Sequence, residues 1–337
     1  MTRAQWLALA QKRLVSVLRA RTIATDRTLE QKISDAGPNN QRVQPLVLTQ
    51  ARKALIATGR IVPIKRGNTH WFYLSETPDE QVQERLAILE PVYDRTQEGL
   101  FKGRLGQALE IAVLKAISIS GRDFLGSYVD LDEHDDSTPY TRLEPPLVIS
   151  GNRIEKGPLD YVIFEPSGTG GIEVKNYRTW LYPDSGAVKQ LLWKCGDAGV
   201  VPVLIARRVP FITFRLFNLS GCLVHQNYRQ LYAQADEDLA GLVRDKNLLG
   251  YHDVQVGNQP DRRLMRFIQE LLPHLVGGAK STFERFRELH RAYGKGEISY
   301  TEWVKRILVS NGIWVEREEE QRWEDLDYPE SGGEGGW

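Results

Sequence analysis

One segment limits the folds open to this chain more than any other. Residues 105–117 read Leu-Gly-Gln-Ala-Leu-Glu-Ile-Ala-Val-Leu-Lys-Ala-Ile, and Glu110 is their single acid. At helical spacing, apolar side chains occupy nearly every side of this segment. A helix that is apolar all round is buried, so other layers must cover it. Strand-like patterns that could supply a layer follow at residues 124–131, 159–164, 171–177 and 200–207.

The order of these segments predicts an α/β fold. A helix at 187–195 separates the last two strands, and a crossover of this kind favours parallel pairing of neighbouring strands. We therefore expect an α/β sandwich with a mixed sheet over residues 103–260. Residues 262–276 and 281–310 have mainly helical patterns and predict a C-terminal helical subdomain over 261–315.

A different pattern occupies residues 1–76. Helical spacing near Trp6, capping residues Thr25-Asp26 and a start at Pro45 predict three helices, of which the second stops at Gly37-Pro38. Strand-like residues 60–64 and 69–74 then flank a basic turn at 65–68. A helical linker is expected over 77–102, with Pro91 breaking its helix.

Charge is distributed unevenly, although the net charge is zero. Residues 1–75 hold 13 lysines and arginines against 3 acids, a balance of +10. Such a segment is a candidate polyanion binder. Residues 316–337 hold 9 acids against 2 arginines, which is typical of an acidic disordered tail and offers a contact for a partner protein.

Three helices followed by a hairpin resemble a winged-helix domain, over about residues 3–76. In that family the third helix enters the major groove and the wing touches the DNA backbone or minor groove. The resemblance implies a DNA-binding surface made of Thr49, Gln50, Arg52, Lys53, Lys65, Arg66, Asn68 and His70. The alternative is that these charges only solvate a small helical domain or a protein-interaction surface.

The overall composition argues against disordered, collagen-like and membrane proteins. The chain is 41% hydrophobic and 26% charged, close to the globular average. No stretch has the roughly 20 apolar residues that span a bilayer, so we expect a cytoplasmic protein without membrane contact. Cys195 and Cys222 form no Cys-x-x-Cys pair, which gives a structural zinc no support.

Three residues carry the pattern that points to chemistry. Asp160 begins the apolar segment 159–164, and Glu173 and Lys175 lie in the next strand, after the glycine-rich turn 167–171. Alternation along a strand puts Glu173 and Lys175 on one face. If the two strands pair as a hairpin, Asp160 reaches the same place. Converging carboxylates repel unless a cation neutralises them, and oxygen ligands favour Mg²⁺.

This pattern resembles the PD-(D/E)XK nuclease superfamily, which includes Holliday-junction resolvases, RecB-like nucleases and many restriction enzymes, over Gly103 to Arg207. The family's aspartate matches Asp160, its Glu-x-Lys matches Glu173-Val174-Lys175, and its helix acid matches Glu110. RecB-like members place a glutamine and a tyrosine on the following helix, where Gln190 and Trp193 stand here. The aromatic differs in type and falls one residue early.

The resemblance implies a restriction-endonuclease-like α/β/α core and a metal-dependent mechanism. Asp160, Glu173, the Val174 carbonyl and Glu110 would hold Mg²⁺, with Mn²⁺ as a substitute. Lys175 would orient or deprotonate a water, or stabilise the phosphate.

The leading hypothesis is a Mg²⁺-dependent endodeoxyribonuclease acting in restriction or defence, on mobile elements, or in recombination. Cutting both strands would call for a homodimer. Two alternatives stay open: a non-catalytic DNA-binding regulator with a nuclease-like assembly domain, and an RNA-directed nuclease.

Overall fold

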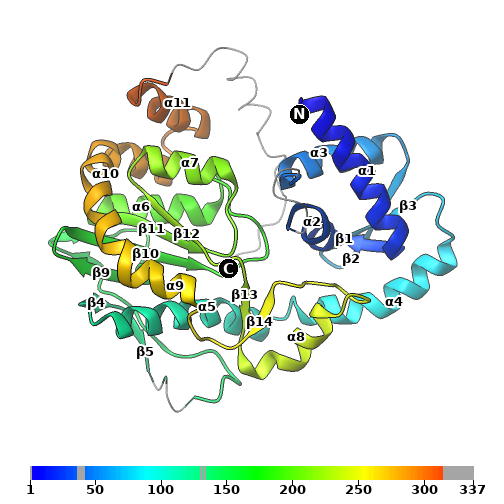
Figure 1. Ribbon diagram of the computed structural model, residues 1–337, viewed down its shortest axis with the longest axis horizontal. Helices are drawn as coiled ribbons and strands as arrows, with labels where there is room; N and C mark the ends of the chain where they lie inside the picture. The colour runs from blue at the N-terminus through cyan, green and yellow to red at the C-terminus, as the bar shows by residue number, and fades with distance from the viewer. Residues whose placement is uncertain (1, 36–41, 130, 132–133, 314–337) are drawn as a thin grey trace.

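The computed structural model describes residues 2–35, 42–129, 131 and 134–313 (Figure 1). The protein is a mixed α/β molecule with a five-stranded mixed sheet, N-terminal helices that carry a small antiparallel sheet, and long C-terminal helices. In Figure 1 the N-terminal elements and the large sheet stand on opposite sides of the molecule. The predicted acidic tail, 316–337, lies outside the described residues.

The large sheet has the strand order β12-β11-β10-β9-β4. Its strands β4, β9 and β10 pair antiparallel, while β10, β11 and β12 run parallel. Helix α6 (Gly186–Ala198) connects β10 to β11, and α7 (Phe211–Leu219) connects β11 to β12. The expected parallel pairing across the helical crossover is therefore confirmed. The strand bounds are β4 Phe124–Leu125, β9 Tyr161–Glu165, β10 Gly168–Lys175, β11 Val201–Ala206 and β12 Leu223–Gln226.

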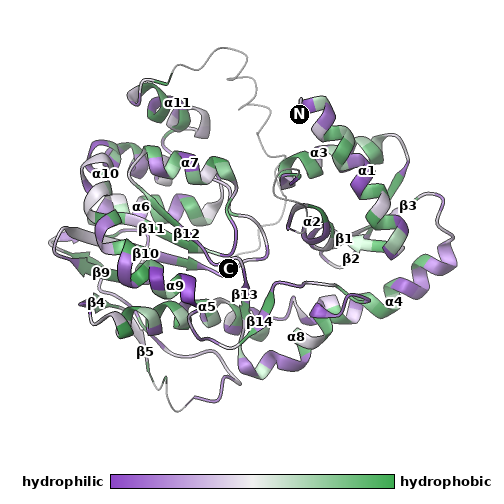
Figure 2. Ribbon diagram, viewed as in Figure 1, coloured by the Kyte–Doolittle hydropathy of each residue, from purple (hydrophilic) through white to green (hydrophobic). Residues whose placement is uncertain are grey.

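The apolar helix is buried, as expected, although it begins earlier. Helix α5 runs from Gly99 to Ser120, and Leu109, Ala112 and Val113 have no exposed surface. With the strands' inward residues it forms one hydrophobic cluster, and α6 and α7 form another on the opposite face. Figure 2 shows β11 and β12 as mainly hydrophobic strands between these layers.

The C-terminal helices pack into the same two clusters. They are α9 (Arg262–Arg266), the π-helical turn η4 (Phe267–Leu271), α10 (Leu272–Lys295) and α11 (Tyr300–Ser310). Leu272, Val276 and Phe283 join the α5 face, whereas Phe286 and Trp303 join the α6 face. The helical character of 262–276 and 281–310 is thus confirmed, and α10 continues through residues 277–280.

Two strand predictions need correction. The strand expected over 171–177 begins earlier, because residues 168–170 of the expected turn belong to β10, and it ends at Lys175. Gly171 suits this crowded place because a Cβ there would lie 2.8 Å or less from side-chain atoms of Val200, Cys195 and Leu159. The expected strand 124–131 is interrupted at Gly126, whose φ of +100° favours glycine. The short strands beyond it are β5 Ser127–Tyr128, β6 Arg142–Leu143, β7 Val148–Ile149 and β8 Asn152–Arg153.

The N-terminal module follows the expected order of helices and hairpin. Thr25 caps a helix by accepting from the Thr28 amide, and the predicted hairpin is confirmed as an antiparallel pair. A third strand, which the sequence did not indicate, adds to the hairpin edge. The predicted stop at Gly37-Pro38 lies outside the described residues. The elements are α1 Arg3–Arg21, β1 Ile23–Thr25, α2 Asp26–Glu30, the π-helical turn η1 Gln31–Asp35, α3 Pro45–Ala57, β2 Ile61–Arg66 and β3 Thr69–Leu74.

The expected break at Pro91 is wrong, because α4 runs without interruption from Asp79 to Arg95. Proline removes one backbone hydrogen bond, yet the buried Leu89, Val92 and Tyr93 hold the turns on both sides of it. These side chains share a cluster with Trp71 of the N-terminal module and with α8 (Glu237–Arg244). The remaining elements are β13 Gln230–Tyr232, the short η3 Gln234–Asp236 and β14 Val254–Val256.

Among the described residues, none of the helices combines the length and apolar character needed to cross a membrane.

Candidate functional site

The candidate site lies where β9 begins and β10 ends. Ile172 pairs with Tyr161 in this antiparallel hairpin, and Asp160 directly precedes Tyr161. The Asp160 amide donates to the Ile172 carbonyl over 3.1 Å, and its Oδ2 accepts from the Val174 amide at 2.7 Å. The hairpin thus brings Asp160 to the end of β10.

Lys175 joins the two strand carboxylates. Its Nζ lies 2.6 Å from Glu173 Oε2 and 3.4 Å from Asp160 Oδ2. Glu173 and Lys175 therefore share a face of β10. All three side chains are largely buried, so their mutual interactions are weakly screened by water.

Two further cations, which sequence reasoning missed, reach the same carboxylates. Lys194 of α6 places its Nζ 2.5 Å from Glu173 Oε1 and 2.6 Å from the Pro158 carbonyl oxygen. Arg142 of β6 places Nη2 3.1 Å from Asp160 Oδ1 and Nη1 3.6 Å from Glu110 Oε2. Lys194 stands one helical turn after Gln190, a spacing that could have flagged it. Arg142 lies in a two-residue strand, within a segment whose sequence shows no periodic pattern.

Glu110 approaches the site from the buried helix α5. The Tyr128 hydroxyl donates to Glu110 Oε2, and the Tyr161 hydroxyl donates to the Glu110 backbone carbonyl at 3.0 Å. Burial, followed by the negative charge of Asp160, raises the pKa of Glu110 to about 7. Ionised Glu110 therefore lacks full compensation in this arrangement.

The pKa values of Asp160 and Lys175 are shifted in opposite directions. Burial disfavours the charged form of Asp160, but Lys175 and Arg142 outweigh it and hold the pKa of Asp160 below its ordinary value. Burial likewise disfavours the Lys175 ammonium, while Asp160 and Glu173 raise the pKa of Lys175 well above its usual range. Lys175 is consequently a firmly protonated cation here.

Gln190 does not join these contacts. It is exposed on α6, and none of the hydrogen bonds recorded among the described residues links it to the site. Trp193 is likewise turned away, with the ammonium groups of Lys156 and Lys295 over its ring at 5.3 and 5.5 Å. The helix position that reaches the site is Lys194.

The oxygen atoms at the end of β10 suit a hard divalent cation. In a strand, the amide and carbonyl of one residue point toward the same neighbouring strand. The Val174 amide points toward β9, where it donates to Asp160, so the Val174 carbonyl points toward β9 as well. Within the described ranges, no three His, Cys, Asp or Glu side chains form a ready metal cage. Mg²⁺ rarely uses such cages and is usually held by one or two carboxylates with waters. Asp160, Glu173, Val174 and Glu110 fit it in donor type.

The residues expected to read DNA fall into three groups. Lys53, Lys65, Arg66, Asn68 and His70 are exposed, and Thr49 and Gln50 are half-buried. Arg52 instead forms an ion pair with Asp26 and lies over the Phe72 ring, 4.6 Å from its centroid. Burial lowers the pKa of Arg52 to about 10. We therefore assign Arg52 to the interior of the module.

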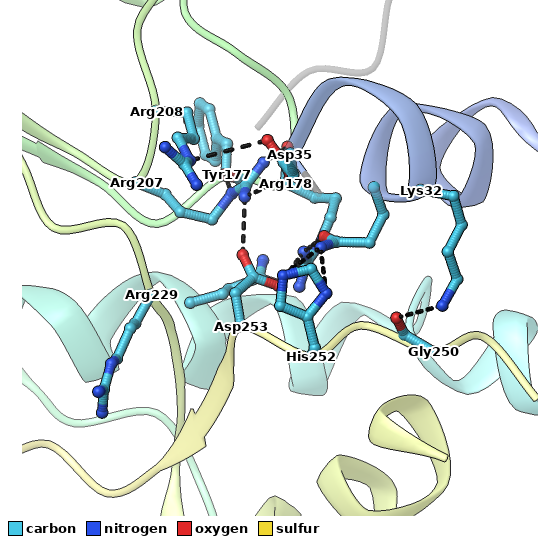
Figure 3. Close-up of polar contacts among 12 residues, drawn as sticks. Lys32, Asp35, Tyr177, Arg178, Arg207, Arg208, Arg229, Gly250, His252 and Asp253 are labelled. Carbon is cyan, nitrogen blue, oxygen red and sulfur yellow. Dashed lines mark hydrogen bonds and ion pairs between the residues drawn. The ribbon is translucent and has the colours of Figure 1, made fainter. Parts of the chain in front are cut away.

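A buried ionic network joins the N-terminal module to the end of the sheet (Figure 3). Arg207, which follows β11, places Nη1 2.9 Å from Asp35 Oδ2 and 2.7 Å from Asp253 Oδ2. Asp253 also pairs with Arg178 at 2.5 Å. The Arg207 amide donates to the Lys175 carbonyl over 3.3 Å, so this network begins at the backbone of the candidate site.

Comparisons with protein-family models, curated proteins and solved structures gave no match to this chain.

Proposed function

We propose that this protein is a Mg²⁺-dependent endodeoxyribonuclease that hydrolyses DNA phosphodiester bonds. The observation that carries the proposal is the convergence of Asp160, Glu173 and Lys175 at the end of β10. Glu110, on the buried helix that precedes the sheet, shares Arg142 with Asp160. Acids and a lysine placed in this way suit metal-assisted phosphodiester hydrolysis.

The arrangement of elements supports the same proposal. A buried helix, three antiparallel strands, a crossover helix and a parallel strand follow one another as α5, β4, β9, β10, α6 and β11. This order resembles the restriction-endonuclease-like core of the PD-(D/E)XK nucleases. The small sheet β1-β3-β2 with three preceding helical segments likewise resembles a winged helix.

The protein residues would hold and orient the reactants. When bound, Mg²⁺ supplies a Lewis acid and lowers the pKa of water. Asp160, Glu173, Glu110 and the Val174 carbonyl would hold it. Lys175 keeps its proton at neutral pH because two carboxylates raise its pKa, so it is suited to stabilise negative charge on the phosphate rather than to remove a proton.

Lys194 and Arg142 would position the carboxylates. Lys194 fixes Glu173 from the α6 side and is itself held by the Pro158 carbonyl. Arg142 bridges Asp160 and Glu110. Since each carboxylate already has an ordered partner, little side-chain freedom would be lost when substrate and cation bind.

The basic N-terminal module supports DNA as the substrate. Its exposed Lys53, Lys65 and Arg66 lie on the third helix and the hairpin, which are the elements that contact DNA in winged-helix domains. A phosphate backbone is the natural partner of such a surface.

A cleavage assay tests the proposed activity. Supercoiled plasmid, linear duplex, single-stranded DNA and RNA would be incubated with the full chain in Mg²⁺, Mn²⁺ or EDTA. We expect metal-dependent cleavage of DNA that is abolished in Lys175→Ala. Equal cleavage by Lys175→Ala would exclude the assigned site, and preferential cleavage of RNA would favour an RNA-directed nuclease.

One observation favours a non-catalytic alternative. The acids Glu110, Asp160 and Glu173 contact the cations Arg142, Lys175 and Lys194, which is a balanced set that could serve structure alone. A DNA-binding protein with an inactive nuclease-like domain would bind duplex DNA, show no cleavage with either metal, and gain no thermal stability from them.

A further inference from the structure

A second surface rich in arginine and aromatic residues lies beyond the ends of β11 and β12. Residues 198–235 contain no aspartate or glutamate but include Arg207, Arg208, Arg215 and Arg229. In the same stretch Phe211 is 67% exposed, Phe214 39% and Tyr228 37%. Exposed aromatic side chains that gather on one surface mark a candidate binding site.

Tyr228 is the centre of this surface. The guanidinium of Arg208 lies 4.7 Å from its ring centroid, and that of Arg263, on the hydrophilic helix α9 (Figure 2), lies 5.3 Å away. Its φ of +62° is a conformation that side chains other than glycine, asparagine and aspartate seldom adopt. The backbone is held there because the Tyr228 amide donates to the Arg207 carbonyl at 3.1 Å.

Two exposed phenylalanines stand at the start of α7, close in the chain to Arg208. The Val209 amide donates to Gln226 Oε1 at 3.3 Å, which keeps the loop after β11 against the end of β12. Phe211 opens α7 immediately after this loop, and Phe214 follows one turn later. Along the chain, Phe211 and Phe214 thus stand between Arg208 and Arg215, and Tyr228 stands next to Arg229.

Arg208 shares its carboxylate partner with another arginine. It is 8% exposed, and within the described residues its Nε makes no hydrogen bond. The carboxylate that it faces there, Asp35, is 3.7 Å away and is shared with Arg207 (Figure 3). Burial, more than any other influence, lowers the pKa of Arg208. An added anion would relieve this shortage of negative charge.

We propose that the surface formed by Arg208, Phe211, Phe214, Tyr228 and Arg263, here called the aromatic–arginine surface, binds single-stranded nucleic acid. The exposed Phe211 and Phe214 rings would stack on unpaired bases, while Tyr228 would hold the guanidinium groups of Arg208 and Arg263 where they meet the phosphates. Strands are bound without base pairing by this combination of stacking and cationic contacts. A duplex hides its base faces, so it cannot use the rings.

The surface lies at the same edge of the sheet as the candidate active site. Lys175, Ala206 and Gln226 occupy matching positions on β10, β11 and β12, and neighbouring strands are about 4.8 Å apart. Tyr228 therefore follows a strand end about 10 Å from Lys175. This step rests on the proposed nuclease function. The protein would then recognise a substrate in which an unpaired strand lies next to the cut.

Fluorescence anisotropy tests the proposal on the full chain in EDTA, with a labelled oligothymidylate of about 16 nucleotides. We expect Tyr228→Asn and Phe211→Ser each to weaken binding by about tenfold, and Tyr228→Phe to retain it. Asparagine tolerates the backbone of position 228, which keeps the fold intact. Ile119→Ser, at a residue of α5 that is 63% exposed, is the matched control and should bind normally.

Three results would overturn the proposal: no binding by the wild-type chain, equal binding by Tyr228→Asn, or the same weakening in Ile119→Ser. Lys65→Ala combined with Arg66→Ala should lower the affinity for duplex DNA and leave the affinity for oligothymidylate unchanged. Loss of oligothymidylate affinity with normal duplex affinity would instead place the single strand on the hairpin. Because binding is measured without metal, failure of this proposal can be distinguished from failure of the proposed nuclease activity, which the plasmid assay measures.

Discussion

Lys194 Nζ lies 2.5 Å from Oε1 of Glu173, on the side of that carboxylate opposite to Lys175. This places a lysine of helix α6 in direct contact with a proposed metal ligand on strand β10. Lys194→Met should reduce cleavage by about tenfold or more, because it removes a charge-assisted hydrogen bond to Glu173. Lys189→Met, on the same helix, is the control. An unchanged rate in Lys194→Met would remove Lys194 from the site.

Substitution of Asp160, Glu173 or Lys175 should have a larger effect. Asp160→Asn, Glu173→Gln and Lys175→Ala are each expected to lower the cleavage rate by about 10²–10³ or more, with circular dichroism unchanged. Glu165→Gln is a suitable control, since Glu165 ends the strand that Asp160 precedes and pairs with Arg122. Normal activity in any of the three site variants would show that the assignment of that residue is wrong.

Duplex binding should depend on exposed cations of the N-terminal module. Replacing Lys53, Lys65 and Arg66 by alanine should weaken duplex affinity and reduce its salt dependence by nearly one unit of slope for each phosphate interaction removed. Arg52→Ala should instead destabilise the protein, because Arg52 pairs internally with Asp26. Affinity titrations at several salt concentrations, with thermal melting, separate the two effects. The surface prediction fails if the triple variant keeps the wild-type salt slope.

Acid should destabilise the protein partly through His290. This side chain is fully buried, accepts from Trp303 Nε1 at 3.2 Å and faces the Ser220 carbonyl at 3.0 Å. Burial lowers the pKa of His290 from 6.5 to about 4. The unfolded chain therefore binds more protons between these values, so stability falls as pH drops from about 6.5 to about 4, by up to about 3 kcal/mol.

His290→Gln should flatten the pH dependence of stability in that range, although burial of His225 contributes in the same direction. Urea denaturation at several pH values measures it. An identical slope in wild type and variant would exclude His290 as a source of acid sensitivity.

The ionic network of Figure 3 should make Asp35 important for stability. Asp35 accepts from Arg207 and, at 2.9 Å, from Trp180 Nε1, and all three side chains are buried. Asp35→Ala leaves Arg207 with one carboxylate partner and should cost about 3–5 kcal/mol. Glu76→Ala removes the exposed partner of Arg19 and should cost under about 1 kcal/mol. Equal effects in urea denaturation would contradict the burial argument.

The parts predictable from sequence are those set by local periodicity. The apolar helix before the strands, the crossover with its parallel pairing, and the shared face of Glu173 and Lys175 all follow from residue spacing. Gly168 and Gly170 belong to β10, whereas the sequence predicts a turn there, because glycine is both a turn residue and a residue for close packing. Only the neighbouring Val200, Cys195 and Leu159 show which role Gly171 has.

The charged partners of the candidate site could not be predicted in the same way. Arg142 reaches Glu110 and Asp160 from a two-residue strand whose position depends on the fold of a long irregular segment. Arg52 has the sequence context of a DNA-reading residue, and its ion pair with Asp26 depends on how two helices pack. Ion pairs between residues far apart in the sequence depend on the tertiary structure, so no periodic pattern in the sequence predicts them.

The cluster that Ile23 and Trp71 share with α4, α8 and Tyr251 has a consequence for protein engineering. A shortened chain that begins after residue 76 would expose the apolar sides of both helices to water, and aggregation is the expected result. Retargeting by exchange of the N-terminal module would therefore require a graft that carries α4 and α8 as well. Chimeras joined at residue 95 and given a matching α8 should express better than chimeras joined at residue 76.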